Sequence, residues 1–376
     1  MSIVIFVSTV LTALLIAMSI RLHRAFGRYK IKKRYSAAIT APSVTVCIPA
    51  RNETHAMAQC IERVLASDYK KLEIIVLDDS SSDDTSILIR SFAHAGVRFI
   101  AGESLPEGWL GKNYALETLA REASGTYVMF IDVDTAIKPT TISEIVGYAM
   151  TESAEMVSVI PARNDSWRVS VLFGHLRYFW ELLLARPSSP AVSGAFWMIK
   201  REALMDRLGG FSPFKLNISP ETTFASKLRP AYRCLLSTAE LGVTYEKKWS
   251  SQVETSRRLA FPMTGGTWWQ GALGLLALTT LNLPTFTVLS SVFYGWTIVQ
   301  IAGLWFTFAF MGLYASYTQR IWRTRWWLGG FMWPAVILQE LVLFVVSIWG
   351  YATHTITWKD RPVTVGATVA SPIIKQ

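Results

Sequence analysis

Residues 44–53 read VTVCIPARNE and residues 73–85 read EIIVLDDSSSDDT, and each stretch begins as a short β-rich run that ends in polar residues. Two further β-rich runs are VRFIA at residues 97–101 and YVMFI at residues 127–131. Helical stretches are expected between these runs, beginning at Thr54, at Asp84 and near Asn113. Strands that alternate with helices predict parallel βαβ units, so we expect an α/β fold with a doubly wound, mostly parallel sheet.

Polar residues follow three of the predicted strands. They are Pro49, Ala50, Arg51, Asn52 and Glu53 after the first strand, Asp78 and Asp79 after the second, and Asp132 and Asp134 after the fourth. The carboxyl ends of parallel strands meet at one sheet edge, where ligands bind. Carboxylates gathered there stay ionised only beside a cation, and Mg²⁺ held by one or two carboxylates completes its coordination with phosphate oxygens.

Lys112, in the GKN sequence of residues 111–113, adds positive charge to the same edge. We therefore expect a divalent cation and a phosphate-bearing ligand at this edge. Each motif has a structural alternative, because an Asp pair often caps a helix and a DxD sequence is common by chance. Their order at successive strand ends favours the joint interpretation.

The composition predicts membrane segments. The chain has 376 residues, of which 51% are hydrophobic and 17% charged, with a mean hydropathy of +0.30. The net charge of +10 comes from the residues that flank apolar segments, since residues 21–34 hold seven basic and no acidic side chains, whereas residues 35–258 are close to neutral. This distribution suits anionic lipid headgroups, and we do not expect a nucleic-acid partner.

Residues 3–20 form an uncharged apolar run that predicts a transmembrane helix. A signal peptide is the alternative, but the positive charge follows the run instead of preceding it. By the positive-inside rule the chain from residue 21 onward lies in the cytoplasm.

The C-terminal part contains two longer apolar stretches. Residues 271–317 predict two helices with a break near Asn282 and Pro284, and residues 326–351 predict either one further helix or a re-entrant pair. The loop of residues 320–325 carries three Arg and is expected in the cytoplasm. Glu340 lies inside an apolar stretch, so it is expected to have a function, to cap a neighbouring helix or to face a wet interface.

These expectations define a multi-pass cell-membrane protein with its soluble domain in the cytoplasm. The predicted parts are a transmembrane anchor at residues 1–20, a basic linker at 21–40, the α/β domain at 41–260, a membrane region of about three helices at 261–352 and a tail at 353–376. Cys47, Cys60 and Cys234 are isolated, so we expect buried free thiols and neither a disulfide framework nor a zinc site.

The ordered motifs VCIPARNE, VLDDSSSDDT, GKNYAL and FIDVDT resemble glycosyltransferase family 2, whose members have the GT-A fold. The resemblance covers roughly residues 43–260. The stretch LPEGWLGKNYA, together with the anchor and the apolar C-terminal region, is similar to membrane-bound members that glycosylate carotenoid or hopanoid-type lipids, such as diaponeurosporenoate glucosyltransferase. The resemblance implies inverting, metal-dependent transfer of a hexose from a UDP-sugar to a membrane lipid acceptor.

The resemblance also implies roles for the residues at the strand ends. Pro49, Ala50, Arg51 and Glu53 would line the nucleotide base and ribose, Asp78 or Asp79 would read the uracil edge, Lys112 would contact the diphosphate, Asp132 would touch the ribose or sugar, and Asp134, with Asp132 beside it, would bind Mg²⁺ or Mn²⁺. The metal would neutralise the charge that grows on the leaving diphosphate.

The acceptor side departs from the family pattern. Family members show Glu-Asp before a helix, with the Asp as catalytic base, whereas SPETTFASKLR at residues 219–229 places Pro220 and Glu221 there. The base would thus be Glu221, although Ser219, Pro220 and Glu221 also make an ordinary helix start. A Glu base suits a carboxylic acid acceptor better than an alcohol, because an acid is already ionised at neutral pH.

Two further segments are candidates for contacts with the substrates. SGAFWMIKR at residues 193–201 is either part of the acceptor wall, through Gly194 and Trp197, or a plain core strand. Arg257 and Arg258 lie where related membrane enzymes have a basic motif near the diphosphate, but the QxxRW sequence itself is absent.

Three alternatives to a lipid glycosyltransferase of this type remain from the sequence. A polyprenyl-phosphate sugar synthase is the first, and a processive polysaccharide synthase is the second, disfavoured by the missing QxxRW and the small apolar region. A catalytically inactive glycosyltransferase-like scaffold is the third. The departure at Pro220 and Glu221 supports this scaffold, and the intact DVD of residues 132–134 argues against it.

Overall fold

The computed structural model describes residues 2–31, 35, 41–163, 176–321, 326–359 and 361–363. Parts of the predicted basic linker, of the loop at 320–325 and of the tail lie outside the described residues. The chain divides into two compact units, which are described separately. The helical unit comprises Met1–Arg28, Asn164–Leu183 and Lys247–Gln376, and the sheet unit comprises Tyr29–Arg163 and Leu184–Glu246.

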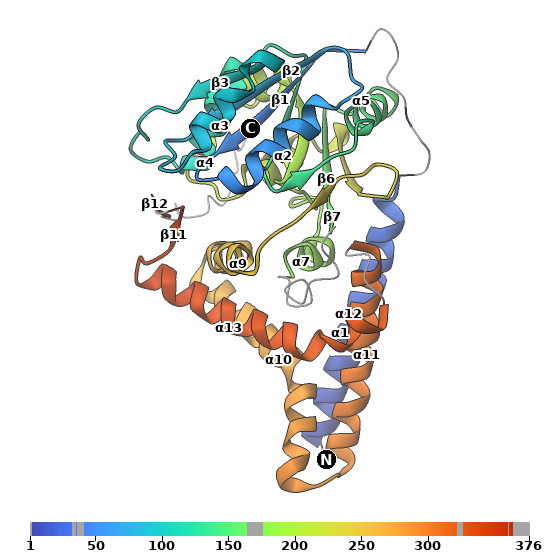
Figure 1. The fold of residues 1–376 in the computed structure, drawn as a ribbon. Coiled ribbons are helices and arrows are strands. Elements are labelled where there is room, and N and C mark those ends of the chain that lie inside the picture. Colours follow the sequence, from blue (N-terminus) through green and yellow to red (C-terminus); the bar gives the residue numbers. More distant parts are fainter. Residues whose placement is uncertain are drawn as a thin grey trace, which may run out of the picture. The chain divides into compact units, whose positions relative to one another are not determined.

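The sheet unit is built on a seven-stranded sheet with the order β3-β2-β1-β4-β8-β6-β9 (Figure 1). Its strands are β1 (Val44–Ala50), β2 (Leu72–Asp78), β3 (Val97–Ala101), β4 (Tyr127–Ile131), β6 (Met156–Ile160), β8 (Phe196–Lys200) and β9 (Tyr232–Leu236). β1 to β4 pair in parallel, and β8 runs antiparallel between β4 and β6. The predicted doubly wound, mostly parallel sheet is confirmed.

The strand order reverses between β1 and β4, which is where a doubly wound sheet opens a ligand crevice. The antiparallel β8 brings a second chain segment to the same edge, because its first residue, Phe196, pairs with the last residue of β4, Ile131. A small sheet of β5 (Thr135–Ala136), β10 (Thr244–Tyr245) and β7 (Ala162–Arg163) follows the end of β4.

Three of the helices between the strands begin within two residues of the predicted positions, and a fourth, at Thr141–Thr151, was not predicted. They are α2 (Thr54–Leu65), α3 (Thr85–Ser91), α4 (Gly111–Glu122) and α5 (Thr141–Thr151). Alternate residues of β1 face opposite sides of the sheet. Val46 and Ile48 belong to the core cluster that also contains Met57 of α2. The Cys47 thiol instead lies 3.8 Å from the carbonyl of Leu119 in α4. Cys47, Cys60 and Cys234 are free and buried, as predicted.

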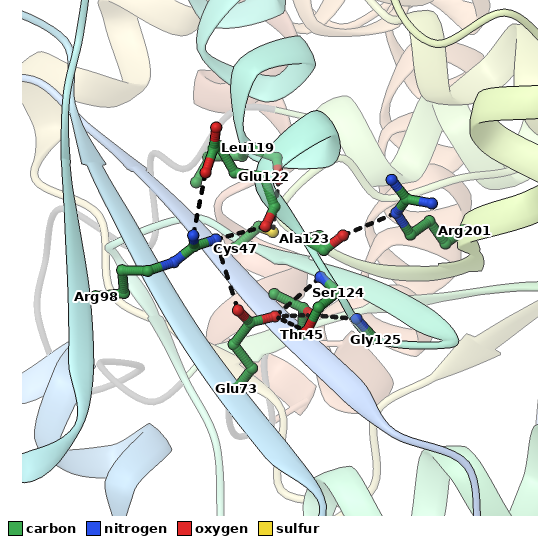
Figure 2. A network of polar contacts seen from close by, with 10 residues as sticks. All are labelled: Thr45, Cys47, Glu73, Arg98, Leu119, Glu122, Ala123, Ser124, Gly125 and Arg201. Atoms are coloured by element: carbon green, nitrogen blue, oxygen red, sulfur yellow. Dashed lines mark hydrogen bonds and ion pairs between the residues drawn. The ribbon is translucent and has the colours of Figure 1, made fainter.

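A polar network fastens the starts of the strands, at the edge opposite the crevice (Figure 2). Glu73 at the beginning of β2 accepts hydrogen bonds from the Thr45 hydroxyl at 2.5 Å and from the Ser124 amide at 3.0 Å. Arg98 of β3 lies 3.5 Å from the Glu73 carboxylate and 3.1 Å from that of Glu122. Burial alone would raise the pKa of Glu73, but these hydrogen bonds and the Arg98 charge lower it below the ordinary value.

The helical unit contains four helices that are long and apolar enough to cross a membrane, at Ile3–Arg28, Trp268–Tyr294, Ile298–Ile321 and Trp333–Ala352. The full set of labelled helices here is α1 (Ser2–Arg28), α7 (Arg177–Leu184), α9 (Trp249–Met263), α10 (Trp268–Tyr294), α11 (Ile298–Ile321), α12 (Trp326–Phe331) and α13 (Trp333–Ala352). Large apolar side chains such as Phe293 and Ile298 are 84% and 78% exposed, which is the surface expected of helices that face lipid. The first helix continues past residue 20 to Arg28.

The predicted break near Asn282 and Pro284 is wrong. Both residues lie inside α10, and the chain turns instead after Tyr294, where Gly295 has a φ of +66°. Glycine tolerates this left-handed conformation, so it ends the helix. Side chains bond the α10 backbone on both sides of this proline: the Asn282 side-chain amide donates to the carbonyl of Leu278 at 2.8 Å, and the Thr287 hydroxyl donates to that of Pro284 at 2.8 Å.

Glu340 caps a neighbouring helix, one of the alternatives expected from the sequence. Its carboxylate accepts a hydrogen bond of 3.0 Å from the backbone amide of Leu176, the residue that precedes α7. A helix start has amide groups without partners inside the helix, and a carboxylate satisfies one of them. The 326–351 stretch itself is interrupted at Met332, between α12 and α13.

Candidate active site

The loops after β1 and β2 are joined into one wall of the crevice. Asn52 has a φ of +52°. Its side-chain Oδ1 accepts a hydrogen bond of 2.9 Å from the backbone amide of Ser82, and its backbone amide donates to the Ser81 hydroxyl at 2.9 Å. The Glu53 amide donates to the Thr85 hydroxyl at 2.8 Å. These contacts bring the residues predicted to bind the nucleotide, Pro49, Ala50, Arg51 and Glu53, beside the DDSSSDDT loop.

Asp78 and Asp79 are both buried, with 6% and 5% of their surface exposed. The Asp78 carboxylate accepts hydrogen bonds from the amide and the hydroxyl of Ser81, so it shapes its own loop. A Cβ atom at Gly102 would lie 2.7 Å from the Asp78 carbonyl oxygen and 3.0 Å from the Asp79 Cα, which shows how closely β3 packs on this turn. Of the two predicted uracil-reading residues, Asp78 thus has a structural role in this loop.

Asp83 secures the far end of the same loop. Its carboxylate accepts hydrogen bonds from the Thr85 amide at 3.1 Å and hydroxyl at 2.5 Å, and from the Thr54 amide at 3.3 Å. Burial would raise the pKa of Asp83, but the hydrogen bonds from Thr85 and Thr54 outweigh it and lower the pKa from 3.8 to about 2. The carboxylate therefore ties the starts of α2 and α3 together.

Lys112 and Asp132 form the central contact of the site. The Lys112 Nζ lies 2.6 Å from the Asp132 Oδ1, and 26% and 31% of these side chains are exposed. Lys112 stands in the first turn of α4, where the amide groups and the dipole of the helix also favour an anion. This edge therefore offers a phosphate-bearing ligand a lysine and a helix start.

Asn113 links this edge to the acceptor side, a role that the sequence motif did not reveal. Its buried amide group donates to the carbonyls of Phe214, Lys215 and Asn217 at 3.1, 3.1 and 2.8 Å. The segment so held leads into α8 (Pro220–Lys227). Within the GKN sequence, Lys112 faces Asp132 and Asn113 fixes the backbone before Glu221.

The DVD turn is pinned to the segment before β8. The Asp132 amide donates to the carbonyl of Ala195 at 2.9 Å, and the Thr135 hydroxyl donates to the same oxygen at 3.2 Å. The carbonyl of Asp134 accepts a hydrogen bond of 3.2 Å from the amide of Glu246. The turn is thus held by its backbone.

The donor set of this turn fits a hard divalent cation. Among the described residues, no group of three His, Cys, Asp or Glu is close enough to hold a metal ion by itself. A cation bound by Asp134, with Asp132 beside it, would therefore take its other ligands from phosphate oxygens and water, as Mg²⁺ does in phosphate sites.

Glu221 lies against Gly194, close to the DVD turn. Only 7% of Glu221 is exposed, and a Cβ atom added to Gly194 would lie 2.4 Å from its Oε1. Gly194 precedes Ala195, whose carbonyl bonds the Asp132 amide. A continuous line of contacts therefore runs from Lys112 through Asp132, Ala195 and Gly194 to Glu221.

The start of α8 differs in detail from the expected one. Ser219 occupies the N-cap position but makes no capping hydrogen bond through its side chain. Asn217 acts instead, because its Oδ1 accepts from the Ser219 amide and its Nδ2 donates to the Thr223 hydroxyl, both at 3.0 Å.

Trp197 belongs to the core, so its proposed contact with the acceptor is corrected. It is 1% exposed, and its ring stacks on that of Phe130 with centroids 4.4 Å apart, next to Phe211 and Phe224. β8 lies inside the sheet with both faces covered, since its residues from Phe196 to Ile199 are all buried. Arg257 and Arg258 lie on α9 in the helical unit, and Arg258 there stacks over Trp358 at 5.1 Å.

Comparison with known proteins agrees with this arrangement. Residues 45–208 match the family model described as glycosyl transferase family 2. The 4,4'-diaponeurosporenoate glycosyltransferase of Staphylococcus haemolyticus is 28% identical over 124 residues, 32% of each chain. The GalNAc(5)-diNAcBac-PP-undecaprenol beta-1,3-glucosyltransferase of Campylobacter jejuni is 30% identical over 116 residues, which cover 29% of this chain and 36% of that protein.

The chain thus spans about a third of the length of these curated relatives. Among solved structures, the mannosyltransferase PcManGT from Pyrobaculum calidifontis, in complex with GDP-Man and Mn²⁺, superposes with a TM-score of 0.61 at 21% identity. The superposition covers 92% of this chain and 99% of that one. At this identity the likeness shows the fold, and the expected GT-A architecture is confirmed.

Proposed function

Residues 45–208 belong to glycosyl transferase family 2, and from this premise we propose that the protein is an inverting, metal-dependent enzyme that moves a hexose from a UDP-sugar to a membrane lipid. The line of contacts from Lys112 through Asp132 and Gly194 to Glu221 carries the proposal. It brings together, at the point where the strand order of the sheet reverses, the positive charge of Lys112, the DVD carboxylates and the buried Glu221.

The donor half of the site binds and orients the nucleotide-sugar. The loops at residues 49–53 and 78–85 form the wall for the base and ribose, with Asp79 at the uracil edge, and Lys112 with the first turn of α4 receives the diphosphate. A Mg²⁺ or Mn²⁺ ion held by Asp134 and Asp132 would neutralise charge on the diphosphate. Lys112 supplies a second positive charge where that negative charge grows.

The acceptor half supplies the base. The acceptor oxygen attacks C1 of the sugar from the face opposite the diphosphate, the bond from C1 to the diphosphate oxygen breaks, and the proton of the acceptor hydroxyl passes to Glu221. A single displacement of this kind inverts the configuration at C1. An ionised carboxylic acid acceptor has no proton to lose and depends less on Glu221.

The apolar helices account for a lipid acceptor. A site attached to a bilayer receives an acceptor that is dissolved in that bilayer, which raises its effective concentration. Arg21, Arg24 and Arg28 at the end of α1 support a cytoplasmic position of this end by the positive-inside rule. Named relatives act, by their titles, on diaponeurosporenoate and on a diphosphoundecaprenol-linked glycan, which supports an isoprenoid lipid acceptor.

The contact between Lys112 and Asp132 also argues against an inactive scaffold. A charged pair that is only partly buried contributes little to stability, so folding alone gives little reason to keep it at the crevice. A polyprenyl-phosphate sugar synthase would use the same donor half and differs only in the acceptor, so the acceptor decides between the two.

The direct test is release of UDP and formation of a glycolipid by the detergent-purified protein. UDP-glucose is supplied with a carotenoid acid, an isoprenoid alcohol or a polyprenyl phosphate, with and without Mn²⁺. We expect turnover that requires Mn²⁺ and a lipid, and its loss in Asp134→Ala but not in Asp206→Ala, a change at an exposed aspartate of the same unit. Absence of turnover with every sugar nucleotide and acceptor would leave the scaffold as the better description.

A further inference from the structure

A cavity of about 440 Å³ lies between α1 and α11 in the helical unit, where the two helices run side by side (Figure 1). Its lining residues repeat every three or four positions on each helix, so one face of each helix forms a wall. They are Leu15, Ser19, Leu22, His23 and Phe26 on α1, and Ala309, Gly312, Leu313, Ser316 and Arg320 on α11.

The two ends of this cavity differ in chemistry. Leu15, Ala309 and Gly312 line one end, and His23 and Arg320 line the other, at the C-terminal ends of both helices. None of the described residues that line the cavity is acidic. Among the residues that the structure describes, Arg320 makes no ion pair, and its guanidinium lies 4.9 Å above the ring of Phe26.

The cavity has room along its apolar end. A Cβ atom placed on Gly312 would meet nothing within 4 Å, so the helix surface there is open over the width of a side chain. A cavity with leucine, alanine and glycine at one end and, among the described residues, an arginine without an ion pair at the other fits a molecule with a hydrocarbon chain and an anionic head. Basic pockets between membrane helices bind the headgroups of anionic lipids in this way.

We propose that this cavity binds one anionic phospholipid of the bilayer. The phosphate accepts hydrogen bonds from the Arg320 guanidinium and the His23 ring, and one acyl chain lies along Leu15, Ala309 and Gly312. Arginine suits this role because its planar group binds phosphate through two hydrogen bonds and stays charged. The bound lipid would hold α1 and α11 together, independently of any reaction in the sheet unit.

The test measures lipid binding by native mass spectrometry of the full chain released from detergent, titrated with phosphatidylglycerol or with phosphatidylcholine of the same acyl chains. We expect phosphatidylglycerol to bind about tenfold more tightly, since both lipids offer the phosphate but only phosphatidylcholine adds a choline ammonium, which the Arg320 charge repels. Arg320→Gln should remove this preference, whereas Arg24→Gln, at an exposed arginine of α1 outside the cavity, should keep it.

A second pair of variants tests the apolar end. Gly312→Leu on α11 fills the cavity and should weaken binding of both lipids at least tenfold, whereas Gly27→Leu on α1, where a Cβ atom would also meet nothing within 4 Å, should not. Thermal unfolding confirms that all variants are folded. Equal affinity of Arg320→Gln and Arg24→Gln for phosphatidylglycerol would overturn the proposal, and so would tighter binding of a polyprenyl phosphate than of phosphatidylglycerol.

Discussion

The Lys112 Nζ lies 2.6 Å from the Asp132 Oδ1, although 20 residues separate them in the chain. The pair joins the start of α4 to the end of β4 at the crevice of the sheet. Because both side chains are partly exposed, an incoming diphosphate can take over the lysine as its partner.

Lys112→Gln should lower kcat/KM for the sugar nucleotide about 100-fold, since removal of one group that stabilises developing charge commonly has this effect. Lys112→Arg keeps the positive charge and should lower kcat/KM less than Lys112→Gln does. Lys71→Gln changes an exposed lysine before β2 and serves as the control. Steady-state kinetics of UDP release measure the effect, and equal rates for Lys112→Gln and Lys71→Gln would remove Lys112 from the mechanism.

Glu221→Gln should slow transfer to an alcohol acceptor about 100-fold or more, because the hydroxyl proton loses its base. Transfer to a carotenoid acid should fall much less. Gly194→Ala should reproduce both results, since a Cβ atom at this position would clash with the Oε1 of Glu221 and displace its carboxylate. UDP binding, measured by calorimetry, should stay unchanged in both variants, and Glu202→Gln at an exposed site is the control.

Asp83 should make the sheet unit sensitive to acid. Its pKa of about 2 lies below the ordinary value of 3.8, so its contribution to stability is fully present above pH 4 and is lost as the pH falls towards 2. Asp83→Asn should lower stability at pH 7 by about 1 kcal/mol or less, because solvent screens an exposed carboxylate. The difference in stability between Asp83→Asn and the wild type should disappear near pH 2.

Unfolding midpoints of the detergent-purified protein at pH 7, 4 and 2.5 measure this change. Asp84→Asn is the matched control, because Asp84 makes no capping hydrogen bond through its side chain. A gap between Asp83→Asn and the wild type that stays constant down to pH 2.5 would contradict the assignment.

Glu73→Gln should destabilise the sheet unit without affecting catalysis. The change weakens the group that accepts hydrogen bonds from the Thr45 hydroxyl and the Ser124 amide (Figure 2). It should lower the free energy of unfolding by about 1 to 3 kcal/mol. The network lies at the strand starts, away from the crevice, so kcat should remain that of the wild type. Glu62→Gln, at an exposed residue of α2, is the control, and a change in kcat with no loss of stability would refute the structural role.

The native thiols should resist alkylation at neutral pH. Cys47 and Cys60 are completely buried, and burial raises the pKa of Cys60 to about 12, so almost no thiolate is present. Intact protein should therefore show no maleimide adduct by mass spectrometry until it is unfolded.

This unreactive background permits a topology test in whole cells. Trp296→Cys, in the turn between α10 and α11, should react with an impermeant maleimide added outside, and Asp206→Cys should react only after permeabilisation. The reverse pattern would place the sheet unit outside the cytoplasm.

Local patterns predicted the parts of the fold that depend on local sequence. The alternation of apolar runs and helix starts located β1 to β4 and α2 to α4, and the polar residues after each strand predicted the edge at which Lys112 and Asp132 meet. The same reasoning placed a break at Pro284, because a proline disfavours a helix interior, whereas the structure carries α10 through this residue.

Contacts between distant segments lay beyond that reasoning. The burial of Trp197 depends on Phe130, Phe211 and Phe224, which the chain brings together only when β8 inserts beside β4. The bonds of Asn113 to residues 214–217 and the contact of Gly194 with Glu221 likewise arise from tertiary packing. The sequence named Gly194 as a candidate for the acceptor wall, but nothing local showed that it lies against Glu221.

The hydrogen bond from the Leu176 amide to Glu340 spans 164 positions and sets an order of events during biosynthesis. Leu176 leaves the ribosome long before Glu340, and until then its amide has only water as a partner. Without Glu340 the start of α7 has no carboxylate to cap it. Its docking is therefore a late step, which only the emergence of α13 permits.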